Sequence, residues 1–240
     1  MFKGGHALRV DEIDRASVDH ILTTTRAVRQ RLDLEREVPL QIVQECLEIA
    51  LQAPTGFNMQ HWRWLVIADP DTRAKLGDII RRIELPFLDV MESDIPEDDH
   101  STWRVARSSR YLAENVGKAP VHVIPCTTSS VQQQAEMFGS LGYDTDLTNM
   151  AASAIYGGIW PAAWSFMLAL RSRGLGSSLT MIHLGAEPEV AELLGIPEDV
   201  SQCGLIPVAW FTGDDFKPGT RLPLQEVTYY EKWGSTEPAG

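Results

Sequence analysis

The twenty residues from Ala151 to Leu170, AASAIYGGIWPAAWSFMLAL, contain no charged side chain, and this run constrains the fold more than any other part of the sequence. A run of that length is long enough to cross a bilayer. Its interior nevertheless holds Gly157, Gly158 and Pro161, and its flanks show no basic bias that would orient a membrane helix. The pattern favours a buried helix, because its small residues allow another backbone or a flat ring to approach closely.

The composition indicates a globular chain of 240 residues, 44% of them hydrophobic, with a formal net charge of −12. That length suits one domain, although two small domains also fit it. The negative charge argues against nucleic acid as a partner. Cys46, Cys126 and Cys203 are far apart and indicate neither a disulfide framework nor a zinc site. The first ten residues lack the apolar region of a signal peptide. We expect a single cytoplasmic domain over 1–240, without a membrane partner.

Hydrophobic spacing and turn residues predict helices that alternate with strands. The predicted helices cover 39–52, a segment that starts at a capping Asp69, a segment around Tyr111, 149–173 and 188–194. The predicted strands or extended segments cover 62–68, 121–126, 177–184 and 204–211. Residues 85–101 are interpreted as a solvated acidic loop, and 127–148 as a lid or an access loop. The class is α+β or mixed α/β, with helices outnumbering strands, and the apolar tail from Thr212 is expected to be ordered.

Several common active-site signatures do not occur in the sequence. None of the six histidines belongs to an HExxH motif, so a metal site is not indicated, and His122 in its apolar run is interpreted as a core residue. GLGSS at 174–178 imitates part of a dinucleotide fingerprint but follows a predicted helix instead of a strand. Neither a GxSxG elbow nor a GxxxxGK[ST] loop is found, which argues against the common hydrolases and nucleoside triphosphatases.

Two segments carry side chains suited to a ligand. APTGFNMQHW, from Ala53 to Trp62, places the carboxamides of Asn58 and Gln60 one residue apart, and such groups suit the edge of a heterocycle. TTTRAVR, at 23–29, places Arg26 and Arg29 three apart. If a helix or turn begins there, both guanidinium groups can bind one dianionic phosphate. Taken alone, a solvated basic surface is the simpler interpretation of these arginines.

Together with GLGSSLTMI at 174–182 and GTRLP at 219–223, these segments resemble the FMN-dependent nitroreductase family. The resemblance covers roughly residues 20 to 233. APTGFNMQHW is similar to the family pattern Ala-Pro-Ser-x-x-Asn-x-Gln-Pro-Trp, and Arg26, Ala27 and Arg29 match three positions of its Arg-Arg-Ser-x-Arg stretch.

The resemblance implies a set of FMN contacts. These are Arg26, Ala27, Arg29, Pro54, Thr55, Asn58, Gln60, Leu179, Thr180, Met181 and Arg221. The three arginines would hold the phosphate, the backbone at 179–181 would run close to N5 of the isoalloxazine ring, and Asn58 and Gln60 would come from the other subunit.

The sequence also departs from the family pattern at four positions. Thr25 stands where the first arginine is usual, Ala27 lacks a hydroxyl, Ser165 replaces a frequent asparagine, and Gly219 stands where some members have lysine. Three arginines remain for the phosphate, so FMN binding is expected with fewer contacts than in members that have the full set.

The family further implies an α+β, nitroreductase-like fold with a central, mostly antiparallel sheet surrounded by helices, in an intertwined homodimer. Residues 1–20 would form an N-terminal extension, and 212–240 an arm on the partner subunit. The implied activity is ping-pong reduction of nitroaromatic, quinone or related conjugated acceptors, with FMN as cofactor and NADH or NADPH as donor.

No catalytic side chain is required by that chemistry, although Tyr156, Trp160 or the 127–148 region would suit the substrate site. Two alternatives stay open. One is an FMN-storing or FMN-sequestering protein of the same fold with little turnover. The other is a dedicated flavin dehydrogenase or dehalogenase of a specific pathway.

Overall fold

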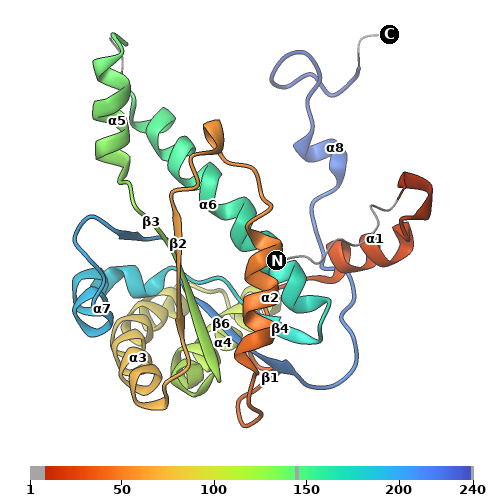
Figure 1. Cartoon of the computed structure of the whole chain (residues 1–240). Coiled ribbons are helices and arrows are strands. Elements are labelled where there is room, and N and C mark those ends of the chain that lie inside the picture. The colour runs from red at the N-terminus through yellow and green to blue at the C-terminus, as the bar shows by residue number, and fades with distance from the viewer. Residues whose placement is uncertain (1–8, 144–145, 239–240) are drawn as a thin grey trace.

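The computed structural model describes residues 9–143 and 146–238, arranged around one central sheet (Figure 1). The strands are β1 (Leu32–Asp33), β2 (Trp62–Ile67), β3 (Val121–Thr127), β4 (Leu175–Ser177), β5 (Ser201–Gln202) and β6 (Ile206–Phe211). Every pairing between them is antiparallel. β6 pairs with β1, β3 and β4, and β3 also pairs with β2 and β5. The centre of the sheet is therefore built from β3 and β6.

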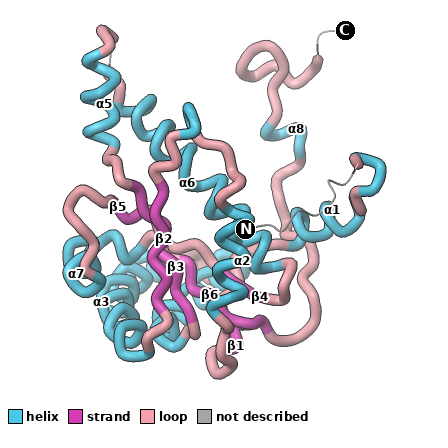
Figure 2. Tube along the Cα trace, viewed as in Figure 1, coloured by secondary structure: helices cyan, strands magenta, loops and turns pink. Residues whose placement is uncertain are grey.

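Helices cover both faces of the sheet (Figure 2). They are α1 (Arg15–Thr24), α2 (Leu40–Ala50), α3 (Pro70–Ser93), α4 (His100–Asn115), α5 (Val131–Ser140), α6 (Thr148–Arg171), α7 (Glu187–Leu194) and α8 (Leu224–Val227). Successive side chains of β3 alternate between the faces. Val121 and Val123 join the core under α2 and α6, whereas Ile124 and Cys126 join the core under α3, α4 and α7. This confirms an α+β fold with a central antiparallel sheet.

The uncharged run forms most of α6, which packs against α2 and α5. Phe166 and Leu170 in its C-terminal half are fully buried, as the sequence pattern predicts, but Tyr156 and Trp164 are exposed. Among the described residues, we find no helix with both the length and the apolarity that a membrane span needs. Most of the other predicted helices and strands are confirmed, with their ends shifted by a few residues.

The interpretation of 85–101 as a loop is wrong for most of its length. α3 continues to Ser93 and α4 begins at His100, so only residues 94–99 connect the helices. The acidic side chains are accommodated by a tertiary contact, because Arg110 of α4 donates to Asp89 Oδ1 at 2.7 Å and to Glu92 Oε2 at 2.8 Å. Leu88, next to Asp89 in the helix, is buried. The run is therefore an amphipathic helix whose carboxylates are paired.

The 127–148 region is also more regular than expected, since it contains α5. A reciprocal cap starts this helix: Ser130 Oγ accepts from Gln133 N–H at 3.1 Å, and Gln133 Oε1 accepts from Ser130 N–H at 2.9 Å. Residues 144 and 145 of this region lie outside the described residues. The segment 177–184 differs as well, because the strand ends at Ser177 and a 3-10 helix follows at Ile182–Ala186.

Three segments extend from the body of the molecule: α1, the paired α5 and N-terminal half of α6, and the tail that carries α8 (Figure 1). The tail leaves its apolar side chains in solvent, with Leu222 67%, Leu224 69% and Trp233 91% exposed. Its start is anchored, because Asp215 accepts from His20 at 2.6 Å and pairs with the buried Arg171. Residues 1–8 of the predicted N-terminal extension and residues 239–240 of the predicted arm lie outside the described residues.

Candidate functional site

The turn from Thr55 to Gln60 holds its side chains outward in an unusual backbone conformation. Phe57, Asn58 and Gln60 have positive φ angles of 49°, 54° and 50°, which for non-glycine residues indicates local strain of the kind that often marks functional sites. Thr55 Oγ1 accepts from Gln60 N–H at 3.3 Å, and Gln60 Nε2 donates to Asn58 Oδ1 at 3.1 Å. All three strained residues are exposed. The turn therefore presents two carboxamides and an aromatic ring to a partner or a ligand.

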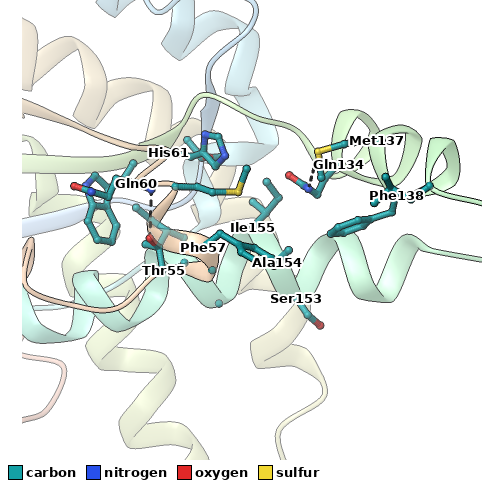
Figure 3. Close-up of a pocket in the computed structure, with 18 residues that line it drawn as sticks. Thr55, Phe57, Gln60, His61, Gln134, Met137, Phe138, Ser153, Ala154 and Ile155 are labelled. Carbon is teal, nitrogen blue, oxygen red and sulfur yellow. Dashed lines mark hydrogen bonds between the residues drawn. The ribbon is translucent and has the colours of Figure 1, made fainter. Parts of the chain in front are cut away.

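A cavity of about 460 Å³, here called the apolar cavity, lies between this turn, α5 and α6. Figure 3 shows Met137 and Phe138 of α5 on one side, with Thr55 and Gln60 on the other. Its lining residues are Thr55, Gly56, Phe57, Met59, Gln60, His61, Trp62, Thr127, Gln134, Met137, Phe138, Leu141, Ser153, Ala154, Ile155, Gly157, Gly158 and Ile159. Among these described residues there is no aspartate, glutamate, lysine or arginine, so the cavity suits a neutral, largely apolar molecule.

A second cavity of about 620 Å³, here called the arginine cavity, brings together residues from three distant parts of the chain. Its lining residues are Arg26, Ala27, Val28, Arg29, Gln30, Arg31, Ser101, Arg104, Val105, Ser108, Phe216, Pro218, Gly219, Thr220 and Arg221. The structure therefore places Arg26, Arg29 and Arg221 in one cavity, although nearly two hundred residues separate them in sequence. Five guanidinium groups without a lining carboxylate suit an anion.

The segment that carries Arg26 and Arg29 is extended, not helical, because α1 ends at Thr24. Val28 between them is buried and donates its N–H to Ser177 O at 2.9 Å, which fixes the segment on β4. Gly176 makes this contact possible, since a Cβ atom there would lie 3.0 Å from Val28 Cγ1. With Val28 fixed on the sheet, Arg26 is exposed and Arg29 is half-buried, and both line the cavity.

The other wall of the arginine cavity comes from the start of the tail. Arg31 fixes this wall, since its Nε donates to Thr212 O at 2.6 Å and its guanidinium lies 4.2 Å from the centre of the Phe216 ring. Among the described residues, Arg26 and Arg221 donate only to backbone carbonyls, of Lys217 at 3.3 Å and of Thr220 at 2.8 Å. Both guanidinium groups therefore keep donors for a ligand.

Beneath Arg29, the carboxyl group of Glu84 on α3 is buried. Burial raises the pKa of Glu84 to about 7, and the positive charge of Arg29 acts against that rise. Burial also lowers the pKa of Arg29, and Glu84 opposes that shift. Glu84 Oε2 makes no hydrogen bond within the described part of the chain. The two groups thus form an electrostatically coupled pair, of which Arg29 lines the cavity.

The remaining predicted contacts lie elsewhere. Thr180 exchanges backbone hydrogen bonds with Leu205, at 3.0 and 2.7 Å, and Leu179 packs in the core. Met181 is half exposed. Like Pro54 and Asn58, these three residues line neither cavity. The two cavities share no lining residue, so one protomer does not bring the arginines and the carboxamides to the same place.

The sequence motifs did not include the cavity residues on α4, whereas those on α5 lie within the 127–148 region that was expected to suit the substrate site. Ser101, Arg104, Val105 and Ser108 recur at the spacing of one helix face, and this pattern is visible in the sequence without any motif. The described residues contain no group of three or more His, Cys, Asp or Glu that could hold a metal ion. His122 is fully buried in the core, where burial lowers its pKa to about 3.

Comparisons with known proteins identify the family of the chain. A model of the nitroreductase family matches residues 22–210. NADH dehydrogenase of Thermus thermophilus is 26% identical over 227 residues, which cover 88% of this chain and 97% of that protein. 4-Nitrobenzoate reductase of Nocardioides sp. is 27% identical over 195 residues, which cover 75% of this chain and 74% of that protein.

The fold is also that of a solved flavoprotein. The crystal structure of oxidized iodotyrosine deiodinase bound to FMN and 3-iodo-L-tyrosine matches with a TM-score of 0.58 at 20% identity, covering 85% of this chain and 93% of that one. The family resemblance carried by the sequence motifs is thereby confirmed. Because the family model spans most of the chain and the fold agrees, the chain belongs to the nitroreductase family and is an oxidoreductase of that family.

Proposed function

We propose that this protein is an FMN-dependent oxidoreductase that uses NADH or NADPH to reduce neutral nitroaromatic, quinone or related conjugated acceptors. The observation that carries the proposal is the meeting of Arg26, Arg29 and Arg221 in one cavity. A phosphate monoester has charge and oxygen acceptors that match guanidinium donors. The residues present therefore fit the phosphate end of FMN.

The isoalloxazine end would be completed by a second copy of the chain. Since the arginine cavity and the apolar cavity share no residue, FMN with its phosphate among the arginines would meet Thr55, Asn58 and Gln60 of the partner subunit. The exposed Phe57, the apolar tail and the outer face of α6 support such a pairing. We propose that 212–240 forms an arm on the partner and that 1–20 extends the single domain.

When bound, FMN would supply the hydride-accepting chemistry, and the protein would bind and orient it. The carboxamides of Asn58 and Gln60 can donate to and accept from a heterocyclic edge. At 179–181, the N–H of Thr180 is already donated to Leu205 O, so the N–H groups of Leu179 and Met181 are the donors that we assign to the N5 side. Side chains of the apolar cavity would exclude water around the acceptor.

The uncharged lining favours a neutral acceptor over a zwitterionic one. Burying an unpaired carboxylate or ammonium group is costly, and the described lining offers no permanent charge to pair with it. The acceptor would stack between the flavin of one subunit and Phe138 of the other. The donor and the acceptor would use the same space in turn, which is why we expect ping-pong kinetics.

The test begins with the absorption spectrum of the purified protein. We expect a yellow protein whose cofactor, released by heat, is FMN, and which oxidises NADH or NADPH with a quinone or a neutral nitroaromatic as acceptor. A colourless protein that fails to bind added FMN would contradict the proposal. Bound FMN without turnover of any donor would instead favour a storage protein.

A further inference from the structure

One face of α4 forms a wall of the arginine cavity that the sequence motifs do not include. Ser101, Arg104, Val105 and Ser108 all line the cavity, at helical spacings of three, one and three residues. This face lines the same cavity as the Arg26–Arg29 segment and the tail residues 218–221. The cavity therefore has a cation, Arg104, that comes from neither the Arg26–Arg29 segment nor the tail.

Within the described part of the chain, Arg104 makes no hydrogen bond or ion pair that would use its donors. Arg110, further along the same helix, is in contrast paired with Asp89 and Glu92. Arg107 is exposed on α4 and does not line the cavity. Arg104 thus differs from the other arginines of α4, because it has both free donors and a place in the cavity.

The electrostatics of the cavity favour a bound anion. Five arginines line it without a carboxylate in the described lining, and only Arg31 is committed to the tail by several contacts. Like charges gathered in this way repel one another unless an anion lies between them. An anion held from the 26–29 segment, the tail and α4 would be enclosed on three sides.

The 26–29 segment also lacks a hydroxyl donor. Thr25 is buried and donates Oγ1 to Ile21 O at 2.6 Å, and Ala27 has no hydroxyl. Ser101 and Ser108 on α4 bring hydroxyl groups to the lining of the same cavity, as does Thr220 on the tail. The face of α4 therefore offers a further cation, and it offers the hydroxyl groups that the N-terminal segment lacks.

We propose that Arg104 is a phosphate-binding residue of this protein and that α4 forms the third wall of its phosphate site. The ligand group is a phosphate monoester dianion, whose oxygens would accept from Arg104 and from the arginines at 26, 29 and 221. The inference rests on the proposed function, which places the phosphate of FMN in this cavity.

The experiment compares Arg104→Gln with Arg107→Gln, a matched change on another face of the same helix. FMN and riboflavin are titrated into the apoprotein of each variant, with flavin fluorescence as the readout. Losing one charge-assisted hydrogen bond should weaken FMN binding by about tenfold in Arg104→Gln. Riboflavin, which has no phosphate, should bind with unchanged affinity, and Arg107→Gln should behave as wild type. Arg104→Lys should recover part of the loss, because it restores the charge without the planar donor geometry.

A further variant, Arg26→Gln, distinguishes a failure of the role proposed for α4 from a failure of the proposed function. If Arg26→Gln weakens FMN binding but Arg104→Gln leaves it within twofold of wild type, the role of α4 is wrong and the proposed function stands. If neither variant affects FMN binding, both are wrong. Equal losses for FMN and riboflavin in Arg104→Gln would show a structural role, which also contradicts the proposal.

Discussion

Glu84 and Arg29 lie close enough for the charge of each to shift the pKa of the other; Glu84 is buried, and Arg29 is half-buried and lines the arginine cavity. The carboxyl group is the more perturbed, because burial raises its pKa from 4.5 to about 7. A protonated Glu84 leaves Arg29 free to bind an anion. An ionised Glu84 competes with that anion for the same guanidinium group.

This pair predicts a pH dependence of stability. The folded state keeps the proton of Glu84 between about pH 4.5 and 7, where the unfolded state releases it. Stability from this group is therefore greatest below pH 4.5 and is lost as the pH rises towards 7. Glu84→Gln should remove that loss, so its free energy of unfolding should exceed that of wild type by about 1–3 kcal/mol between pH 5 and 7.5. Denaturant unfolding of both proteins at pH 5 and at pH 7.5 measures this difference. A free energy of unfolding that changes with pH in the same way for Glu84→Gln and wild type would contradict the prediction.

The lining of the apolar cavity predicts discrimination by charge. 4-Nitrobenzamide and 4-nitrobenzoate have similar shapes, but only the second carries a charge that must be desolvated. We expect kcat/KM for the amide to exceed that for the carboxylate by about tenfold or more. Steady-state NAD(P)H oxidation with both acceptors measures the ratio. A preference for the carboxylate would show that a cation reaches the cavity from outside its described lining.

The exposed apolar tail predicts a dimer that depends on it. Removal of residues 224–240 takes away Leu224, Val227 and Trp233, all of which are more than half exposed in the single chain. Dimer interfaces of this kind bury on the order of 2,000 Å² or more. Light scattering should give a dimer for the full chain and a weaker, concentration-dependent one for the truncated chain. A full-length protein that stays at 26.7 kDa at micromolar concentration would exclude the shared flavin site.

Much of the fold could be predicted from local signals. Asp69 caps α3 and Pro70 occupies its first turn, and the β-favouring run at 62–68 contains β2. The continuation of α3 could not be predicted in this way, because its acidic residues are paired with Arg110, which comes from the next helix. α5 had a readable signal in Ser130 and Gln133, but its apolar spacing is weak.

The family resemblance, and not the spacing of residues, predicted which distant residues belong to the candidate site. Arg26 and Arg221 are far apart in the sequence, and only the fold brings them into one cavity. Arg104 belongs to no motif, so its place in the cavity became visible only when α4 was packed on α3. The contact of the carboxamides with FMN stays a prediction, because it requires a second subunit.

The central claim is that the arginine cavity holds the phosphate of FMN, and titration of Arg221→Ala with FMN and riboflavin tests it most directly. Removing one charge-assisted hydrogen bond should weaken FMN binding about ten- to a hundredfold. Riboflavin binding should change little, because its ring contacts are untouched, and Arg107→Ala should affect neither ligand. Equal losses for FMN and riboflavin, or no loss for either, would contradict the assignment of the phosphate to this cavity.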